Sequence, residues 1–156
     1  MSGATDQQLA IIILITNCCF ILNLFKEWKF IMLKVLIVDD SIFSQKTTAN
    51  LIGKLLDDVE IFFAKDGEEG FIKYKNIKPD YTFIDLLMPK INGQELLKLI
   101  KEFNNDAKVF VVSADVQKSV RAEMEAYNVM AFINKPFNEE KAQLVCEMIR
   151  TEKVNE

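Results

Sequence analysis

The chain has 156 residues, half of them hydrophobic, which is enough for one domain of ordinary size plus a short extra segment. Its formal net charge of −4 argues against a nucleic-acid-binding surface, because binding a phosphate backbone requires clustered lysine and arginine side chains. The absence of histidine excludes Ser-His-Asp and Cys-His nucleophile pairs, and the three cysteines, which lack disulfide-framework or CxxC spacing, indicate a reducing compartment.

Residues 1–32 differ in composition from the rest of the chain. Leu9–Phe25 is an uncharged, mostly apolar run, slightly shorter than the about 20 residues that a bilayer-spanning helix needs. Lysines follow this run and none precedes it, so a membrane-spanning leader would leave the remaining domain in the cytosol. No basic stretch precedes the run, which argues against a cleaved signal peptide. Three interpretations remain open: a membrane anchor through residues 9–25, an incidental leader, or an extra packed apolar helix.

The remaining domain opens with a strand, a helix and a second strand. Leu33–Val38 is a short apolar run rich in β-branched residues, which predicts a strand. In Ile42–Leu56 apolar residues recur on one helical stripe, which predicts a helix. Val59–Ala64 resembles the first strand in composition and length. Asp66, with Glu69 three residues later, is a pattern that typically begins a second helix.

The same alternation continues through the middle of the chain. Tyr81–Ile84 follows a proline and predicts the third strand. Asn92, followed three residues later by a glutamate, predicts the start of a helix that runs to Phe103. Ala107–Val112 is again a nearly continuous apolar run, interrupted only by Lys108, and predicts the fourth strand. Such nearly continuous apolar strands are typical of a parallel sheet that is buried on both faces.

The last part of the chain completes the pattern. Apolar residues at helical spacing over residues 116–127 predict a fourth helix, and Val129–Ile133 predicts the fifth strand. Asn138 is placed to cap a fifth helix, which carries apolar residues as far as Ile149. Five strand–helix units of this length predict an α/β fold with a parallel sheet covered by helices on both faces.

Polar residues stand at the ends of four of these strands. Asp39 and Asp40 follow the first strand, Asp85 the third, Ser113 the fourth and Lys135 the fifth. Ligands of such sheets bind at the carboxyl ends of the strands, so these side chains are expected to converge. Clustered carboxylates without histidine or cysteine suit a hard cation, Mg²⁺ first, and a lysine suits a phosphoryl group. The combination favours phosphoryl transfer, in which a carboxylate can itself be the nucleophile.

Four short motifs at these strand ends resemble, in order, those of the receiver domain of bacterial two-component response regulators. The resemblance covers Leu33 to about Arg150, predicts a receiver domain over residues 33–152, and is nearest to single-domain, chemotaxis-type regulators. It implies a flavodoxin-like, doubly wound five-stranded sheet with strand order 2-1-3-4-5 and five helices. The motifs are Val38-Asp39-Asp40-Ser41, Asp85-Leu86-Leu87-Met88-Pro89-Lys90-Ile91-Asn92-Gly93, Val112-Ser113-Ala114 and Asn134-Lys135-Pro136-Phe137.

The resemblance implies a chemical role for each residue that matches the family's motifs. Asp85 is expected to accept a phosphoryl group from a phosphohistidine on a sensor histidine kinase. Asp39 and Asp40, together with Asp85 and the backbone carbonyl of Leu87, are expected to hold Mg²⁺. Lys135 is expected to contact the phosphoryl group. The chain is then a phosphoacceptor and not an enzyme, with only self-phosphorylation from a donor and slow autodephosphorylation.

The resemblance also implies a switch. Ser113 is expected to turn toward the phosphoryl group, and Phe132 to move inward with it, although a buried aromatic residue is also often plain core. Lys135-Pro136 is expected to be a cis peptide bond. The output face is then the fourth helix, the fifth strand and the fifth helix, which would bind a downstream protein in the cytoplasm.

Several alternatives stay open at this stage. Taken singly, the polar residues at the strand ends are typical of helix caps or surface positions, and only their combination favours a phosphorylation site. The receiver could also be a phosphorelay intermediate that passes its phosphoryl group to a histidine phosphotransfer domain. Leu87 favours slow hydrolysis of the phosphorylated state by excluding water, whereas Asp115 favours orienting a water molecule, so the lifetime of that state is open.

Enzymes with a similar sheet fit the sequence poorly. The loop after the first strand, residues 39–44, lacks the glycines of a P-loop or of a dinucleotide-binding fingerprint. A phosphatase with an aspartyl-phosphate intermediate would carry a second acid two residues after a nucleophile on the first strand. Ser41 occupies that position relative to Asp39, so this enzyme class is a remote alternative.

Overall fold

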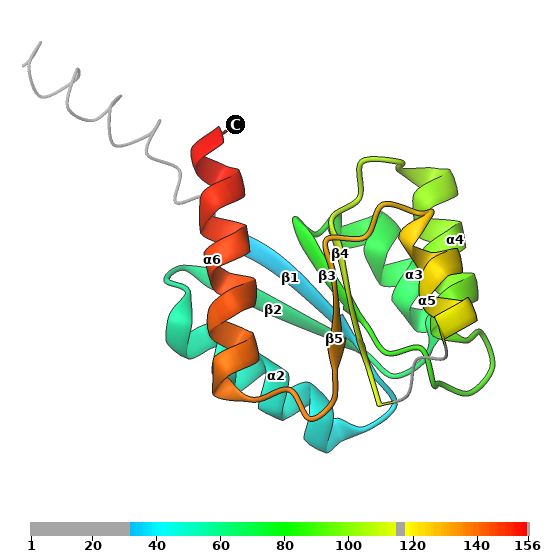
Figure 1. The fold of residues 1–156 in the computed structure, drawn as a ribbon, viewed down its shortest axis with the longest axis horizontal. Helices are drawn as coiled ribbons and strands as arrows, with labels where there is room; N and C mark the ends of the chain where they lie inside the picture. Colours follow the sequence, from blue (N-terminus) through cyan, green and yellow to red (C-terminus); the bar gives the residue numbers. More distant parts are fainter. Residues whose placement is uncertain (1–31, 115–117, 156) are drawn as a thin grey trace, which may run out of the picture. The chain divides into compact units, whose positions relative to one another are not determined.

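The computed structural model describes residues 32–114 and 118–155 (Figure 1). The apolar run Leu9–Phe25 and the side chain of Asp115 lie outside the described residues. Among the described helices, none combines the length and the apolar character needed to cross a bilayer. The interpretations of the leader and of Asp115 therefore stay predictions.

The described chain is built on a single sheet of five parallel strands in the order β2-β1-β3-β4-β5. This order confirms the prediction, and β1 lies between β2 and β3 with Val38 in register with both Ala64 and Ile84. Because β1 pairs with β2 on one side and with β3 on the other, the carboxyl ends of β1 and β3 lie side by side. The strands are β1 Leu33–Val38, β2 Val59–Ala64, β3 Tyr81–Ile84, β4 Val109–Ser113 and β5 Ala131–Asn134.

Two strands begin later than the sequence predicts. β4 starts at Val109 and not at Ala107, because the chain leaves α4 through a turn in which the Ala107 N–H donates to the Asn104 carbonyl at 3.1 Å. β5 starts at Ala131 because the backbone of Asn128 adopts a left-handed conformation with φ of 53°. Val129 and Met130 are apolar residues that directly precede β5, so composition alone does not mark that boundary, whereas Ala107 is separated from β4 by the charged Lys108.

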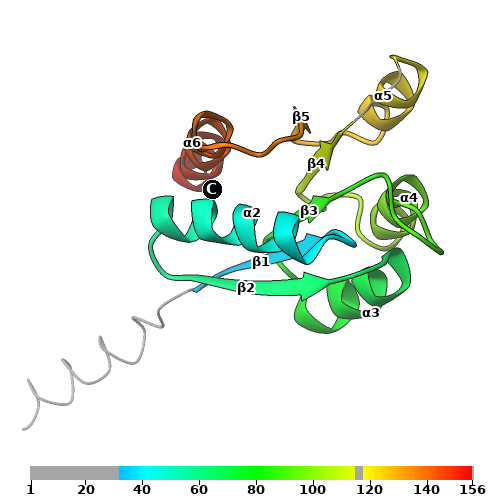
Figure 2. The ribbon, with the colours of Figure 1, turned by 90° about the horizontal axis from the view of Figure 1, so that it is seen from below.

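Five described helices cover the two faces of the sheet (Figure 2). α2 and α6 lie on one face, where their apolar residues pack with Phe83 and Phe110, whose rings stack 5.0 Å apart. α3, α4 and α5 lie on the other face, around Ile84 and Leu96. Each fully buried large apolar side chain contributes about 1.5–3 kcal/mol. The helices are α2 Ile42–Leu55, α3 Gly67–Ile77, α4 Gly93–Phe103, α5 Lys118–Glu125 and α6 Glu139–Asn155.

The helices that follow β1, β2 and β3 begin with a side-chain cap at the edge of the sheet where those strands end. Ser41 caps α2, Asp66 caps α3 and Asn92 caps α4, each accepting the N–H three residues later. Asp66 and Asn92 are caps as predicted. In the first turn of α3, however, the Glu69 carboxylate accepts the N–H of Lys65, one residue before the position that a capping box would use.

Lys101, on α4, ties three backbone segments together from a buried position. Its Nζ donates to the carbonyls of Ala107 at 2.8 Å, Asn128 at 3.1 Å and Asn105 at 3.2 Å, and burial lowers the pKa of this lysine. Lys101→Met should lower the free energy of unfolding by about 1–3 kcal/mol, because these carbonyls lose their shared donor. Urea unfolding measures this change, with Lys98→Met on the exposed face of α4 as control. Equal midpoints for the two variants would contradict the prediction.

Candidate functional site

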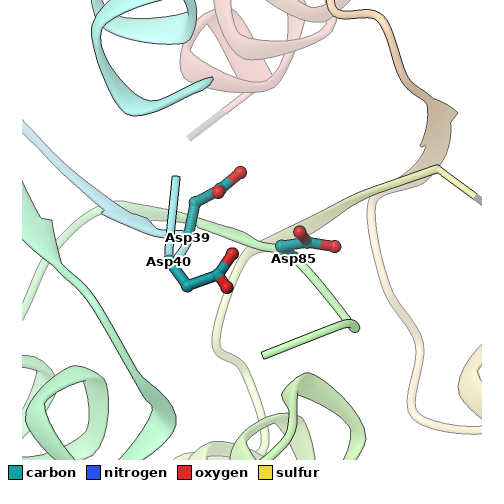
Figure 3. A group of neighbouring side chains, drawn as sticks. All are labelled: Asp39, Asp40 and Asp85. Atoms are coloured by element: carbon teal, nitrogen blue, oxygen red, sulfur yellow. The ribbon is translucent and has the colours of Figure 1, made fainter. Parts of the chain in front are cut away.

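Three carboxylates meet at the edge of the sheet where β1 and β3 end (Figure 3). The backbone N–H of Asp39 donates to the Ala64 carbonyl, and that of Asp85 to the Val38 carbonyl, so strand pairing continues into both residues. Asp39 and Asp85 are each 5% exposed, whereas Asp40 is exposed. One carboxylate oxygen from each of the three residues lies within 4.8 Å of the others.

Lys135 joins two of these carboxylates. Its Nζ lies 2.7 Å from Asp39 Oδ2 and 2.6 Å from Asp85 Oδ2. The side chain comes from the loop after β5, which is anchored by a 2.9 Å hydrogen bond from the Lys135 N–H to the Ser113 carbonyl. Lys135-Pro136 is a cis peptide bond, as predicted. The structure thus brings Asp39, Asp40, Asp85 and Lys135 together, as the strand-end pattern predicts.

Burial and the hydrogen bonds between these groups shift the pKa values of Asp39 and Lys135 in opposite directions. Burial raises the pKa of Asp39, and the hydrogen bonds from Lys135 and from the Ser41 N–H only partly offset it. Burial lowers the pKa of Lys135, but the hydrogen bonds to Asp39 and Asp85 outweigh it, so the pKa of Lys135 is raised. Lys135 therefore remains a cation at neutral pH and holds the two buried carboxylates together.

The donor set fits a hard divalent cation. Asp39, Asp40 and Asp85 offer only oxygen, the ligand type that Mg²⁺ prefers. With all groups ionised, three carboxylates and one ammonium carry a net charge of −2, which a divalent cation would neutralise. Leu87, the remaining predicted ligand residue, donates its N–H to Asp85 Oδ1 at 3.2 Å and is 60% exposed.

Ser113 lies at the end of β4 with its hydroxyl fully buried. Its exposed fraction is 0%, and within the described part of the chain its Oγ finds no hydrogen-bond partner. A buried hydroxyl without a partner is uncommon and calls for an explanation, such as a ligand that supplies the missing atom. Thr82, on β3, carries the second such hydroxyl among the described residues. It lies in the strand interior and not at the strand end.

Phe132, on β5, is only partly buried and packs at the border of the core formed with α3, α4 and α5. The guanidinium of Arg121 on α5 lies 5.5 Å from the centre of its ring, and the same guanidinium pairs with Glu125 at 3.0 Å. Phe132 is thus not a fully buried core residue. Its role as a switch stays a prediction.

Gln45 is a site residue that the sequence patterns do not reveal. It lies on the buried side of α2, and its Nε2 donates to the carbonyls of Asp39 at 2.7 Å and Ala64 at 2.9 Å. These bonds hold the start of the loop that carries Asp39 and Asp40 against β2. The available signal was a long polar side chain on the buried stripe of a helix, which usually has a specific partner.

A comparison with family models matches residues 35–147 to the response regulator receiver domain. The chain belongs to this family. The receiver is 36% identical over 104 residues to the chemotaxis protein CheY of Thermotoga maritima, covering 67% of this chain and 86% of that protein. It is 34% identical over 110 residues to CheY of Listeria monocytogenes, covering 70% and 92% of the two chains.

The chain also resembles part of a larger protein and several solved structures. The receiver is 30% identical over 104 residues to a protein-glutamate methylesterase/protein-glutamine glutaminase of Geobacter sulfurreducens, and this match covers only 28% of that protein. Among solved structures, the response regulator domain of Thermotoga maritima CheB is 32% identical, with a TM-score of 0.68 and coverage of 77% and 95%. Borrelia burgdorferi CheY, in a complex with CheX, BeF3 and Mg²⁺, is 33% identical, with a TM-score of 0.68 and coverage of 76% and 87%.

Proposed function

We propose that this receiver is a stand-alone phosphorylation switch. Asp85 accepts a phosphoryl group from a phosphohistidine of a sensor histidine kinase, and the phosphorylated receiver changes its affinity for a protein partner. The observation that carries this proposal is the contact of the Asp85 carboxylate with the Lys135 ammonium, inside a cluster of carboxylates. The coverage of most of the length of two CheY proteins supports a stand-alone role.

The chemistry requires little of the protein beyond position and charge. A carboxylate oxygen of Asp85 attacks the phosphorus, a P–O bond forms, and the P–N bond to the donor imidazole breaks. The imidazole leaves with the bonding electrons and takes up a proton from solvent. Lys135 Nζ lies 2.6 Å from Asp85 Oδ2, so a phosphoryl group on Asp85 would lie beside a fixed positive charge.

Asp39, Asp40 and Asp85 are the residues that would hold Mg²⁺, with the backbone carbonyl of Leu87 as a further ligand. When bound, the cation would offset the negative charge that develops on the transferred group. The ionised form of Asp39 is needed for this role. Gln45 and the Ser41 N–H keep its backbone and carboxylate in place.

In the proposed switch, phosphorylation moves Ser113 and Phe132 and thereby changes the partner-binding face formed by α5, β5 and α6. A phosphoryl oxygen would give the Ser113 hydroxyl the partner that it lacks among the described residues. On the output face, a groove of about 920 Å³ lies beside β5 and α6, lined by Phe132, Leu144 and Met148 among others. Leu144 is 57% exposed there, an apolar side chain that a protein partner could cover.

Ser113→Ala separates this role from a structural one. Because the hydroxyl is buried without a partner in the described chain, its removal should leave the free energy of unfolding unchanged or raise it, and should not lower it. Phosphorylation should slow by roughly 10- to 100-fold, because a donor to the transferred group is lost. Thr82→Val is the matched control and should leave the phosphorylation rate unchanged. A wild-type rate in Ser113→Ala would contradict the role of Ser113.

The proposal is tested by incubating the full chain with Mg²⁺ and radiolabelled acetyl phosphate. A switch should become labelled stoichiometrically and then bind a partner with changed affinity. Rapid loss of the label to a histidine phosphotransfer domain would favour the phosphorelay alternative. Multiple turnover of a small phosphate ester would point to a phosphatase, and an unlabelled chain would refute the proposal.

A further inference from the structure

The loop that carries Asp85 is tied to the start of α3 by an ion pair. Lys90 Nζ lies 2.7 Å from Asp66 Oδ2, and the Asp66 side chain is only 4% exposed. The other oxygen, Oδ1, accepts the Glu69 N–H at 2.9 Å, which caps α3. These two contacts lower the pKa of Asp66, the Glu69 N–H most strongly. A buried carboxylate on one loop therefore has a cation supplied by the phosphoacceptor loop, residues 85–92.

The backbone of the same loop is held close to α3. The Gly67 N–H donates to the Ile91 carbonyl at 3.2 Å, and a Cβ at Gly67 would lie 2.4 Å from that oxygen. In this part of the loop the backbone of Lys90 has a φ of 64°, which lies in the left-handed region that residues with a side chain rarely adopt. A conformation of this kind persists only where surrounding contacts enforce it.

The other end of the loop is equally confined. The Gly93 N–H donates to the Leu86 carbonyl at 3.1 Å, and a Cβ at Gly93 would lie 2.1 Å from the Asp85 carbonyl. The segment from Asp85 to Asn92 is therefore fastened at both ends, to α4 beside Asp85 and to α3 beside Lys90. A change at the α3 end has few ways to relax other than by moving the segment that contains Asp85 and Leu87.

We propose that Lys90 is a positioning residue for the phosphorylation site, acting through its ion pair with Asp66. The pair fixes the phosphoacceptor loop so that the Asp85 carboxylate and the Leu87 backbone face the cation site in one arrangement. Lys90 touches no reacting group and acts only through the loop. This inference rests on the proposed function, because it concerns the same Mg²⁺ and phosphoryl site.

The direction in which Mg²⁺ affinity changes when Lys90 is replaced distinguishes a positioning role from a purely electrostatic effect of its charge. Lys90 is a cation on the loop beside an anionic cluster, so electrostatics alone predicts that removing it would strengthen the binding of Mg²⁺. Loss of positioning predicts weaker binding. The two explanations therefore predict opposite changes in the dissociation constant for the same substitution.

The test uses the full chain and the variants Lys90→Met, Lys90→Arg and Asp66→Asn. Calorimetric titration with MgCl₂ should show binding weakened roughly three- to tenfold in Lys90→Met, with recovery in Lys90→Arg. Asp66→Asn keeps an oxygen to cap α3 and should weaken Mg²⁺ binding in the same direction. Hydrogen exchange of the Gly67 amide without Mg²⁺ should become faster in Lys90→Met. Lys98→Met, a matched loss of charge on α4, should match the wild type in both measurements.

Unchanged or tighter binding of Mg²⁺ in Lys90→Met would overturn the inference. Unchanged exchange of the Gly67 amide would also overturn it, whatever the result with Mg²⁺. The two proposals fail in different ways. A wild-type chain that takes up no phosphoryl group refutes the proposed function, whereas a phosphorylated wild type with a Lys90→Met variant of equal Mg²⁺ affinity refutes only the positioning role.

Discussion

Asp85→Asn should take up no phosphoryl group from a small donor in the presence of Mg²⁺, whereas the wild type should be fully labelled. Asparagine replaces the nucleophilic carboxylate with a neutral amide, whose oxygen is too weak a nucleophile to form the acyl phosphate. The substitution also leaves the Lys135 ammonium paired with Asp39 alone. Intact-mass spectrometry after incubation with acetyl phosphate and Mg²⁺ measures the outcome directly.

Asp57→Asn is the control for this experiment, because Asp57 is an exposed aspartate between α2 and β2. It should be labelled like the wild type. Circular dichroism should show that both variants are folded, because asparagine has the size of aspartate. An adduct that persists in Asp85→Asn would mean that another side chain is the acceptor.

Lys135→Met should impair both stability and phosphorylation. Asp39 and Asp85 are each 5% exposed and share this one ammonium, so its loss leaves two buried carboxylates facing each other. The free energy of unfolding without Mg²⁺ should fall by roughly 1–3 kcal/mol, less than for a fully buried pair because Lys135 itself is partly exposed. The rate of phosphorylation should fall roughly 100-fold, because the fixed charge beside the phosphoryl group is lost.

Mg²⁺ should recover part of the lost stability, since a ligand that binds only the folded state stabilises it in proportion to the logarithm of its concentration. Thermal unfolding of Lys135→Met across a series of MgCl₂ concentrations measures this recovery. Lys98→Met provides the control for loss of a lysine charge. A Lys135→Met variant with wild-type stability in EDTA would contradict the proposed pairing of charges.

Much of the fold could be predicted because buried strands consist mainly of apolar residues, which are visible in the sequence. β1, β2 and β3 are nearly continuous apolar runs between polar loops, and their observed bounds match the predicted ones. The starts of β4 and β5 were harder to place, because apolar residues also occur just before the paired segments. There the boundary depends on a turn after α4 and on the left-handed backbone of Asn128, which composition does not encode.

The candidate site could be predicted in part for a topological reason. In a parallel sheet every strand points the same way, so polar residues that follow the strands gather at one edge. Asp39, Asp85 and Lys135 meet there although Lys135 is distant from both in the chain. The contacts of Gln45, and of Lys90 with Asp66, depend on how helices and loops pack across the sheet. No local sequence pattern specifies such long-range pairs.

Identification of the modified residue tests the central proposal most directly. The full chain is phosphorylated with acetyl phosphate and Mg²⁺, and the acyl phosphate is then reduced with borohydride, which converts a phosphorylated aspartate to homoserine. Peptide mass spectrometry locates that residue. Homoserine at position 85 alone is the predicted result, whereas homoserine at position 39 or 40, or a chain without homoserine, would contradict Asp85 as the phosphoacceptor.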